Sequence, residues 1–361
     1  MTYKWGDLIS LEYGKPVKDK ARKDGKYPVY GTNGQIGTSD LPPLCNHASF
    51  ILGRKGAYRG VHYSSTPFSV IDTAFYAVNL HPELLDIKWA YYKFLTYDIN
   101  SMDSGSAIPS TDRYEIYAIE VELPNTSVQE KQVQLLECFD DKILNLRQIN
   151  DNLQQQAAAL FANFYDQAET EVGFTEMIQI LGGGTPKTGE SSYWNGDIPF
   201  FTPKDVGFPY TLTTEKTITE EGLAHCNSRL YPINTVFVTA RGTVGKVGLP
   251  GVPMAMNQSC YALVGKDTHQ LLVYFYTLKA VDRLKHKASG AVFDAITTRD
   301  FEPENIMKLS DDDTKAFLDV AEPIYQAVLN NSIENLRLSE LRDSLLPKLM
   351  NGEIDVSDIR L

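Results

Sequence analysis

Two parts of this 361-residue chain repeat each other at an offset of 186 residues. Residues 54–61 read RKGAYRGV and residues 240–247 read ARGTVGKV. At the same offset, residues 71–75 and 257–261 are short runs that lead into an aromatic residue. An internal repeat is the signature of one structural module present in two copies. We therefore expect two modules that do the same task on two targets, or on the two halves of one target.

Each copy alternates short runs of β-branched and aromatic residues with turn signals, which is typical of strands. These runs cover residues 27–30, 49–52 and 73–78 in the first copy and 198–201, 235–238 and 260–264 in the second. Each copy also has one helical stretch, over residues 86–97 and 270–287. The sequence thus predicts an α+β chain with two globular domains of mixed strands and short helices, residues 1–125 and 173–310.

A long helix is predicted after the first globular domain, because residues 126–168 contain neither glycine nor proline. Ser127 and Glu130 fit a capping box at its start. Core-type residues then recur at alternating spacings of three and four, which is the pattern of a coiled-coil seam. The seam comprises Leu136, Phe139, Ile143, Leu146, Asn150, Leu153, Ala157, Leu160 and Phe164. Asn150 is the polar member that we expect to fix the register. Some 40 helical residues would span roughly 60 Å.

A second long helix is predicted from residue 311, where three aspartates complement a helix N-terminus. Its apolar side is formed by Leu329, Ile333, Leu336, Leu341, Leu345 and Leu349. The repeat offset pairs Phe139 with Tyr325, and Leu160 with Leu346. Pro323 should kink or restart this helix, and Pro347 should end or bend it. We expect residues 126–172 and 311–361 to form two long antiparallel coiled-coil helices that separate the globular domains in a pseudo-two-fold repeat.

The net charge of −12 does not exclude a nucleic-acid partner, because the excess acid is concentrated in the two helical segments. Residues 1–125 and 173–310 carry net charges of −1 and 0, whereas residues 126–172 and 311–361 carry −5 and −6. The four cysteines form no CxxC pair, and neither a secretory signal nor a long apolar run is present. We therefore expect a cytoplasmic protein with free thiols, no metal site and no membrane association.

Recognised catalytic motifs are missing from the sequence. The glycine-rich string at residues 182–189 has Glu190 where a phosphate-binding loop needs lysine, so a tight turn is the simpler interpretation. The sequence also lacks HExxH and GxSxG. We accordingly predict no catalytic residues.

Polar and basic residues recur at equivalent places in the two copies. Glycine-flanked turns near Arg54 and Arg241 follow predicted strands, where glycine permits close approach to a surface and arginine can reach base edges or phosphates. The candidate DNA contacts are Arg54, Lys55, Tyr58, Arg59, Thr202, Lys204, Arg241, Thr243, Lys246, Asn257 and Gln258. Further lysines and arginines lie at residues 15–26 and 279–287 and are candidates for phosphate contact. Any one such cluster is more often a solvated surface, so the argument depends on the recurrence.

The second copy carries two strings that point to a family. They are Gly183-Gly184-Thr185-Pro186-Lys187 and, a few residues on, Gly196-Asp197-Ile198-Pro199 within residues 193–205. With the closing segment, residues 345–354, and the layout of the whole chain, they resemble the specificity subunit of Type I restriction–modification systems. The first copy departs from the strings, with Gly14-Lys15-Pro16 and Gly25-Lys26-Tyr27-Pro28 in the corresponding places.

The resemblance implies a non-enzymatic subunit that binds double-stranded DNA. Each globular domain would read one half of a bipartite, asymmetric site, and the helices would set the unread gap. Two copies of a DNA methyltransferase subunit would dock on the helices, near Phe139, Ile143, Asn150, Leu329 and Leu336. The chain itself would hold no cofactor. S-adenosylmethionine, ATP and Mg would belong to the methyltransferase and restriction subunits. The alternative is a coiled-coil scaffold whose two globular domains bind proteins.

Overall fold

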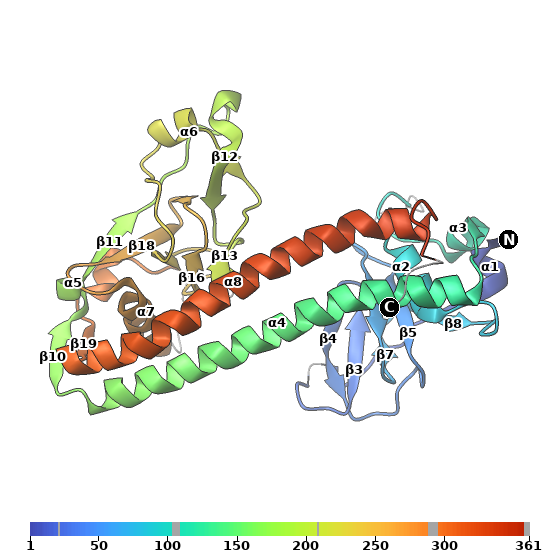
Figure 1. The fold of residues 1–361 in the computed structure, drawn as a ribbon, viewed down its shortest axis with the longest axis horizontal. Helices are drawn as coiled ribbons and strands as arrows, with labels where there is room; N and C mark the ends of the chain where they lie inside the picture. Colours follow the sequence, from blue (N-terminus) through green and yellow to red (C-terminus); the bar gives the residue numbers. More distant parts are fainter. Residues whose placement is uncertain (21, 103–108, 208, 288–294, 357–361) are drawn as a thin grey trace. The chain divides into compact units, whose positions relative to one another are not determined.

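A computed structural model of the chain describes residues 1–20, 22–102, 109–207, 209–287 and 295–356. These residues form two compact units. Unit 1 comprises residues 1–143 with the segment from Arg337 onward, and unit 2 comprises residues 144–336. Each unit therefore contains one globular domain and a part of both long helices (Figure 1). The predicted α+β class, with strands and short helices in the globules, is confirmed.

Unit 1 is built on three small sheets. Its elements are β1 (Thr2–Lys4), α1 (Trp5–Leu8), β2 (Ile9–Tyr13), β3 (Tyr27–Gly31), β4 (Gly34–Ser39), β5 (Ser49–Gly53), β6 (Val61–Ser64), β7 (Ser69–Val70), β8 (Ala74–Asn79), α2 (Ile87–Phe94), α3 (Arg113–Ala118) and β9 (Glu120–Glu122). The sheets have the strand orders β2-β8-β5-β6, β4-β3-β7 and β1-β9. Pairing is antiparallel except between β3 and β7.

Unit 2 repeats this plan with additions. Its elements are β10 (Thr170–Gly173), α5 (Phe174–Met177), β11 (Ile178–Gly182), η1 (Ser191–Tyr193), β12 (Trp194–Phe201), β13 (Tyr210–Thr211), β14 (Thr217–Ile218), α6 (Glu220–Ala224), β15 (Val236–Thr239), β16 (Val247–Pro250), β17 (Ala255–Met256), β18 (Cys260–Gly265), α7 (Gln270–Lys287), η2 (Thr298–Phe301) and β19 (Asn305–Lys308). The strand orders are β11-β18-β15-β16-β13, β14-β12-β17 and β10-β19.

The strand pairings show how the two copies correspond. The parallel pair β3–β7 aligns Tyr30 with Val70, and the parallel pair β12–β17 aligns Phe201 with Met256. Around β5 and β15 the offset between equivalent residues is the predicted 186. The Arg54 N–H donates to the carbonyl of the residue before β8, and the Ala240 N–H donates to the carbonyl of the residue before β18. Nearer the N-terminus it is shorter, because Gly14 matches Gly183. The difference is taken up between β12 and β15, where unit 2 has β13 and α6 in addition to β14, which pairs with β12 as β4 pairs with β3.

The two long helices are α4 (Thr126–Gln167) and α8 (Asp311–Met350). Within each unit their segments lie side by side in opposite directions (Figure 1). The predicted seam is confirmed, because Leu136, Ile143, Leu146, Asn150 and Ala157 are buried. The remaining seam residues, Phe139, Leu153, Leu160 and Phe164, are half-buried.

The start of α4 differs from the prediction. Asn125, rather than Ser127, caps it, since Asn125 Oδ1 accepts a hydrogen bond from the Val128 N–H at 3.0 Å. The corresponding cap of α8 is Ser310, whose Oγ accepts from the Asp313 N–H at 3.1 Å. Because these caps lie 185 residues apart, the residue that corresponds to Tyr325 is Asp140, and the predicted pairing with Phe139 is wrong by one position.

Neither proline of α8 restarts or ends the helix, which corrects that part of the prediction. The helix continues through Pro323 and Pro347, both of which are exposed, so water can replace the backbone donor that each proline lacks. The helix ends at Met350 and is followed by Gly352, which has a left-handed φ of 74°. There the Gly352 N–H donates to Leu349 O and the Glu353 N–H to Lys348 O, at 3.1 and 2.9 Å. This is a Schellman cap.

The core of unit 1 joins its globule to the helices. Trp5 packs against Phe94 of α2 with ring centroids 4.7 Å apart. Buried Gln132 of α4 accepts a hydrogen bond from Trp89 Nε1 at 2.6 Å and donates to Leu349 O at 2.7 Å. Lys93 of α2 donates to Met350 O at 3.0 Å, and burial lowers the pKa of its ammonium group. The end of α8 is thereby held by both α2 and α4.

The core of unit 2 joins its globule to the helices through aromatic side chains. Phe161 of α4 stacks on Phe275 of α7 at 4.9 Å and meets Phe317 of α8 edge-on at 5.6 Å. Arg283 of α7 donates to the Tyr165 hydroxyl of α4 at 3.2 Å. Helix α7 therefore packs on both long helices.

Candidate nucleic-acid interface

A hollow of about 470 Å³ in unit 2 brings five of the predicted contact residues together. They are Thr202, Lys204, Arg241, Thr243 and Asn257. Lys216 contributes a further cation to the lining. The hollow lies where the turns after β12, β15 and β17 meet, so these residues come together although they are far apart in the sequence.

The backbone fixes Arg241 at the rim of this hollow. The N–H groups of Ala240 and Arg241 both donate to the carbonyl of Ser259, at 2.8 and 3.3 Å. Gly242 follows with a φ of 80°, which favours glycine, and the turn is closed by a hydrogen bond from the Thr239 hydroxyl to Thr243 O. The side chain of Arg241 is exposed and takes part in no ion pair among the described residues. Its guanidinium group is free to accept a ligand.

Two other predicted residues have partners within the chain. The hydroxyl and N–H of Thr202 both donate to Asp205 Oδ2, at 2.6 and 2.8 Å, so Thr202 retains only acceptor capacity. Lys204 Nζ lies 3.6 Å from Glu215 Oε2, but the lysine side chain is 80% exposed. This ion pair is solvated and weak, so a phosphate can compete for the lysine.

The remaining predicted residues of unit 2 lie outside the lining of the hollow. Gln258 Oε1 accepts a hydrogen bond from the Thr185 hydroxyl, which ties the Gly-Gly-Thr-Pro string to the turn after β17. Lys246 is exposed and borders a separate cleft with Gly245 and Lys285. The structure thus gathers five of the seven candidates and leaves two beside them.

Unit 1 has a different surface at the equivalent place. Arg54 and Lys55 donate their N–H groups to Thr73 O at 2.9 and 3.1 Å, as Ala240 and Arg241 do to Ser259. The Arg54 side chain donates to Asp72 O at 2.9 Å and lies over the Tyr13 ring, 4.8 Å from its centroid. Tyr58 is 63% exposed in the same turn, and Lys55 is half-buried.

The predicted DNA contact at Arg59 is wrong for this structure. Its side chain is 2% exposed, and Nη2 donates to the carbonyls of Ile99 and Asn100 at 3.3 and 2.8 Å. The Arg59 N–H also donates to Asn100 Oδ1 at 2.7 Å. Arg59 therefore holds the segment after α2 in place and presents no charge to a ligand.

Three candidate residues of unit 1 were not predicted. Arg113, the first residue of α3, lies over the Tyr13 ring, 5.0 Å from its centroid, and over the Tyr114 ring at 5.1 Å. Tyr13 and Tyr114 are 46% and 64% exposed. Tyr13 stands next to the Gly14-Lys15-Pro16 string, which was a usable signal. No sequence pattern marks Arg113 as a candidate. It lies beside Tyr13 because a β-bridge between Lys55 and Ser110 holds the segment before α3 against the turn after β5.

The family model of the Type I restriction modification DNA specificity domain matches residues 1–155 and again residues 170–308. The chain belongs to this family. Both copies are matched, which confirms the resemblance and the duplication.

Individual relatives agree with this assignment. The MjaIX specificity subunit of Methanocaldococcus jannaschii is 32% identical over 124 residues, covering 33% of this chain and 29% of that protein. The HindI specificity subunit of Haemophilus influenzae is 29% identical over 185 residues, covering 50% of this chain and 40% of that protein. The matched segments thus span less than half the length of these two relatives. The crystal structure of the S subunit from M. genitalium has the same fold, with a TM-score of 0.62, 15% identity and coverage of 97% and 95%.

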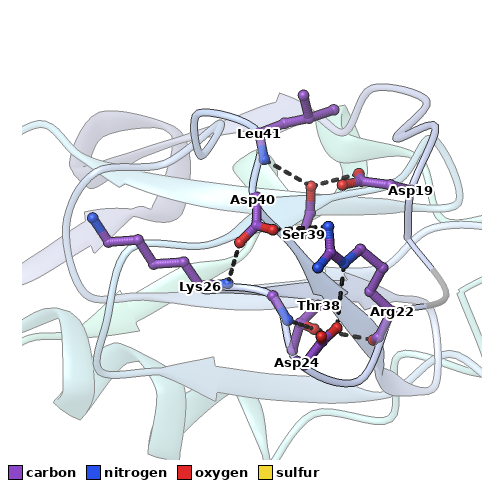
Figure 2. Close-up of polar contacts among 9 residues, drawn as sticks. Asp19, Arg22, Asp24, Lys26, Thr38, Ser39, Asp40 and Leu41 are labelled. Atoms are coloured by element: carbon purple, nitrogen blue, oxygen red, sulfur yellow. Dashed lines mark hydrogen bonds and ion pairs between the residues drawn. The ribbon is translucent and has the colours of Figure 1, made fainter.

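The basic loop before β3 is more structured than its sequence suggests. Figure 2 shows Arg22 between two carboxylates, with Nη1 2.8 Å from Asp40 Oδ2 and Nε 3.3 Å from Asp24 Oδ1. The hydrogen bond from Arg22 holds the pKa of the Asp24 carboxyl below its usual value. The Ser39 hydroxyl donates to Asp19 Oδ1 at 2.6 Å and lowers the pKa of Asp19 in the same way. Arg22 is thus neutralised, while Lys20, Lys23 and Lys26 stay exposed beside it.

The residues predicted to mark partner docking lie inside the helix pairs. Ile143, Asn150 and Leu329 are 4%, 5% and 6% exposed, and Phe139 and Leu336 are half-buried. The side chains of the three buried residues are packed between the chain's own helices, so they mark the position of the predicted docking but are not themselves available to another subunit. A docking protein would meet the outer helix faces instead.

Two further properties concern the described residues alone. They contain no group of three or more histidine, cysteine or acidic side chains arranged to hold a metal ion. No helix among them is both long enough and apolar enough to span a membrane.

Proposed function

We propose that this chain is the DNA-reading subunit of a Type I restriction–modification system and has no catalysis of its own. The observation that carries the proposal is the match of one DNA specificity domain model to both copies. The near-neutral globular domains with exposed cations at equivalent turns support it, since phosphate contacts need local rather than global positive charge. Family membership supports this function over the protein-binding scaffold.

Each unit is proposed to read one half of a bipartite, asymmetric site. Support comes from the divergence of the two surfaces at equivalent positions. Unit 2 has a hollow beside Arg241, whereas unit 1 has Arg54 stacked on Tyr13. Equivalent backbones with different side chains are what two unlike half-sites require.

The partners are proposed to be two DNA methyltransferase subunits and the restriction subunits, in the cytoplasm. The acidic outer faces of α4 and α8 would receive the methyltransferases, and the helices would set the number of unread base pairs. S-adenosylmethionine, ATP and Mg are then expected on those partners. The acidic charge of residues 126–172 and 311–361 supports protein rather than DNA contact there.

The test is a DNA selection with the chain and the methyltransferase subunit of its own organism. From random duplexes, the complex should enrich one bipartite motif, with affinity that falls steeply as salt rises, because bound phosphates release counterions. The enriched motif should coincide with the methylated sites of the cell's genome. Enrichment of no motif at any salt concentration would refute DNA reading and favour the scaffold.

A further inference from the structure

The exposed end of the main sheet in unit 1 carries a layered group of side chains. Tyr13 ends β2 and is paired with Phe75 of β8, with ring centroids 5.0 Å apart. Arg54 lies 4.8 Å from the Tyr13 centroid, and Arg113 lies 5.0 Å from it. Two guanidinium groups therefore share one tyrosine ring. We call Tyr13, Arg54 and Arg113 the Tyr13 stack.

The contacts of the stack fix both arginines without neutralising them. Arg54 donates to the carbonyl of Asp72 at 2.9 Å, and Arg113 donates to the Tyr114 hydroxyl at 3.2 Å. Neither forms an ion pair with a carboxylate among the described residues, whereas Arg22 of the same unit is held by two. A guanidinium that lies against an aromatic ring keeps its charge and presents the edge with its N–H donors. The stack thus offers preorganised donors at a surface.

Planar, preorganised donors suit one ligand group of duplex DNA in particular. Arginine forms its commonest base-specific contact with the O6 and N7 atoms of guanine in the major groove, through two parallel hydrogen bonds. Because the ring contact already restricts the side chains, less conformational entropy is lost on binding. A phosphate would also attract the arginines, but it would not require the stacked geometry.

Unit 2 lacks the stack at the corresponding positions. Gly182 ends β11 and pairs with Tyr261, as Tyr13 pairs with Phe75, and Ala240 stands in the place of Arg54. Space is open at Gly182, where an added Cβ would meet nothing within 4 Å. This particular set of contacts is therefore specific to unit 1.

From these observations we propose that Tyr13, Arg54 and Arg113 read guanine in the half-site bound by unit 1. The proposal rests on the proposed function and specifies one of its contacts. Arg54 and Arg113 supply the hydrogen bonds to the base, and Tyr13 is a positioning residue that orients both.

The experiment compares the motifs selected by variants of the complex of this chain with its methyltransferase subunit. Arg54→Ala and Arg113→Ala should each lose the preference for guanine at one or two positions of one half-site. Binding to the original motif should weaken about 5- to 150-fold, and binding to random duplex should change less. Tyr13→Phe should keep the motif because the ring remains, whereas Tyr13→Gly, which copies unit 2, should relax it.

Two controls make the result decisive. Arg22→Ala removes an arginine already paired with Asp24 and Asp40 and should leave the motif unchanged. Arg54→Lys and Arg113→Lys keep the charge but lose the paired N–H donors of the guanidinium group, so they should relax the motif as the alanine variants do. They also keep the proposal testable if an alanine variant fails to fold. An unchanged motif in all arginine variants, or an equal loss of affinity on every sequence, would overturn the proposal. Selection of no motif by the wild-type complex would refute the proposed function itself.

Discussion

Asn331 of α8 donates from Nδ2 to Oδ1 of Asn150 of α4 at 2.8 Å, within the helix pair of unit 2. Asn150 donates in turn to Val328 O and Ser332 Oγ, at 3.2 and 3.3 Å. The amide at this seam position is 5% exposed, so its polar atoms depend on these partners. Such a buried polar contact favours one register of the helices over neighbouring registers.

We expect Asn150→Ala to lower the free energy of unfolding of unit 2 by about 1–3 kcal/mol, because Asn331 loses its acceptor and the amide's hydrogen bonds are lost. Chemical denaturation measures the change. Asp151→Ala, at the exposed neighbouring position, is the matched control and should change stability by less than about 0.5 kcal/mol. Equal effects of both substitutions would show that the amide network does not stabilise the pair.

Glycine is required at one structurally equivalent position in both copies. An added Cβ at Gly183 would overlap the carbonyl oxygen of Asn257, and one at Gly14 would overlap that of Ile71. We expect Gly183→Ala and Gly14→Ala each to lower the free energy of unfolding by about 3 kcal/mol or more, because the backbone must move to make room for the new Cβ. The melting temperature should fall accordingly. Gly182→Ala should cost little, since its Cβ would have open space. A thermal melt that places Gly182→Ala and Gly183→Ala at the same temperature would contradict this account.

The periodic features of the fold could be predicted from the sequence, and the features made by tertiary contacts could not. The seam from Leu136 to Phe164 was readable because heptad spacing is local in the chain. The effect of Pro323 was not, because it depends on which side of α8 the residue occupies. The cap at Asn125 could not be predicted, because Ser127 and Glu130 offer a local capping pattern that the helix does not use.

The candidate site shows the same division. Arg241, Thr243 and Asn257 were identified because their turns recur in both copies, and the hollow of unit 2 unites them. Arg59 looked equivalent to its neighbours in the sequence, yet its guanidinium is buried against the carbonyls of Ile99 and Asn100. Arg113 could not be found, because a bridge between residues 55 and 110 brings it beside Tyr13.

The alkaline stability of unit 2 should depend on Tyr274. Burial raises the pKa of Tyr274 to about 12 from the ordinary value of 10.0. Between these pH values the folded chain retains a proton that the unfolded chain releases, so this stabilisation is complete below pH 10 and is lost as pH rises toward 12. Tyr274→Phe should make the decline in unfolding free energy shallower by about 1.4 kcal/mol per pH unit in that window.

The measurement is urea denaturation of wild type and Tyr274→Phe from pH 7 to pH 12. Below pH 9 the difference between the two proteins should be constant, which provides an internal control for the lost hydrogen bond to Tyr325. Parallel curves across pH 10–12 would show that Tyr274 titrates equally in the folded and unfolded states.

Arg241 and Lys204 should contribute differently to DNA binding by unit 2. Arg241 is exposed at the rim of the hollow without an ion-pair partner among the described residues, whereas Lys204 is a flexible, 80% exposed cation beside Glu215. Arg241→Ala should weaken binding to the preferred motif by about 1–3 kcal/mol and relax one position of the unit 2 half-site. Lys204→Ala should weaken binding to all sequences alike and reduce the salt slope by about 1, since one phosphate contact releases about one counterion.

Titrations of cognate and random duplexes at several salt concentrations separate the two effects. Equal losses on both duplexes for Arg241→Ala would assign it to the backbone rather than to a base.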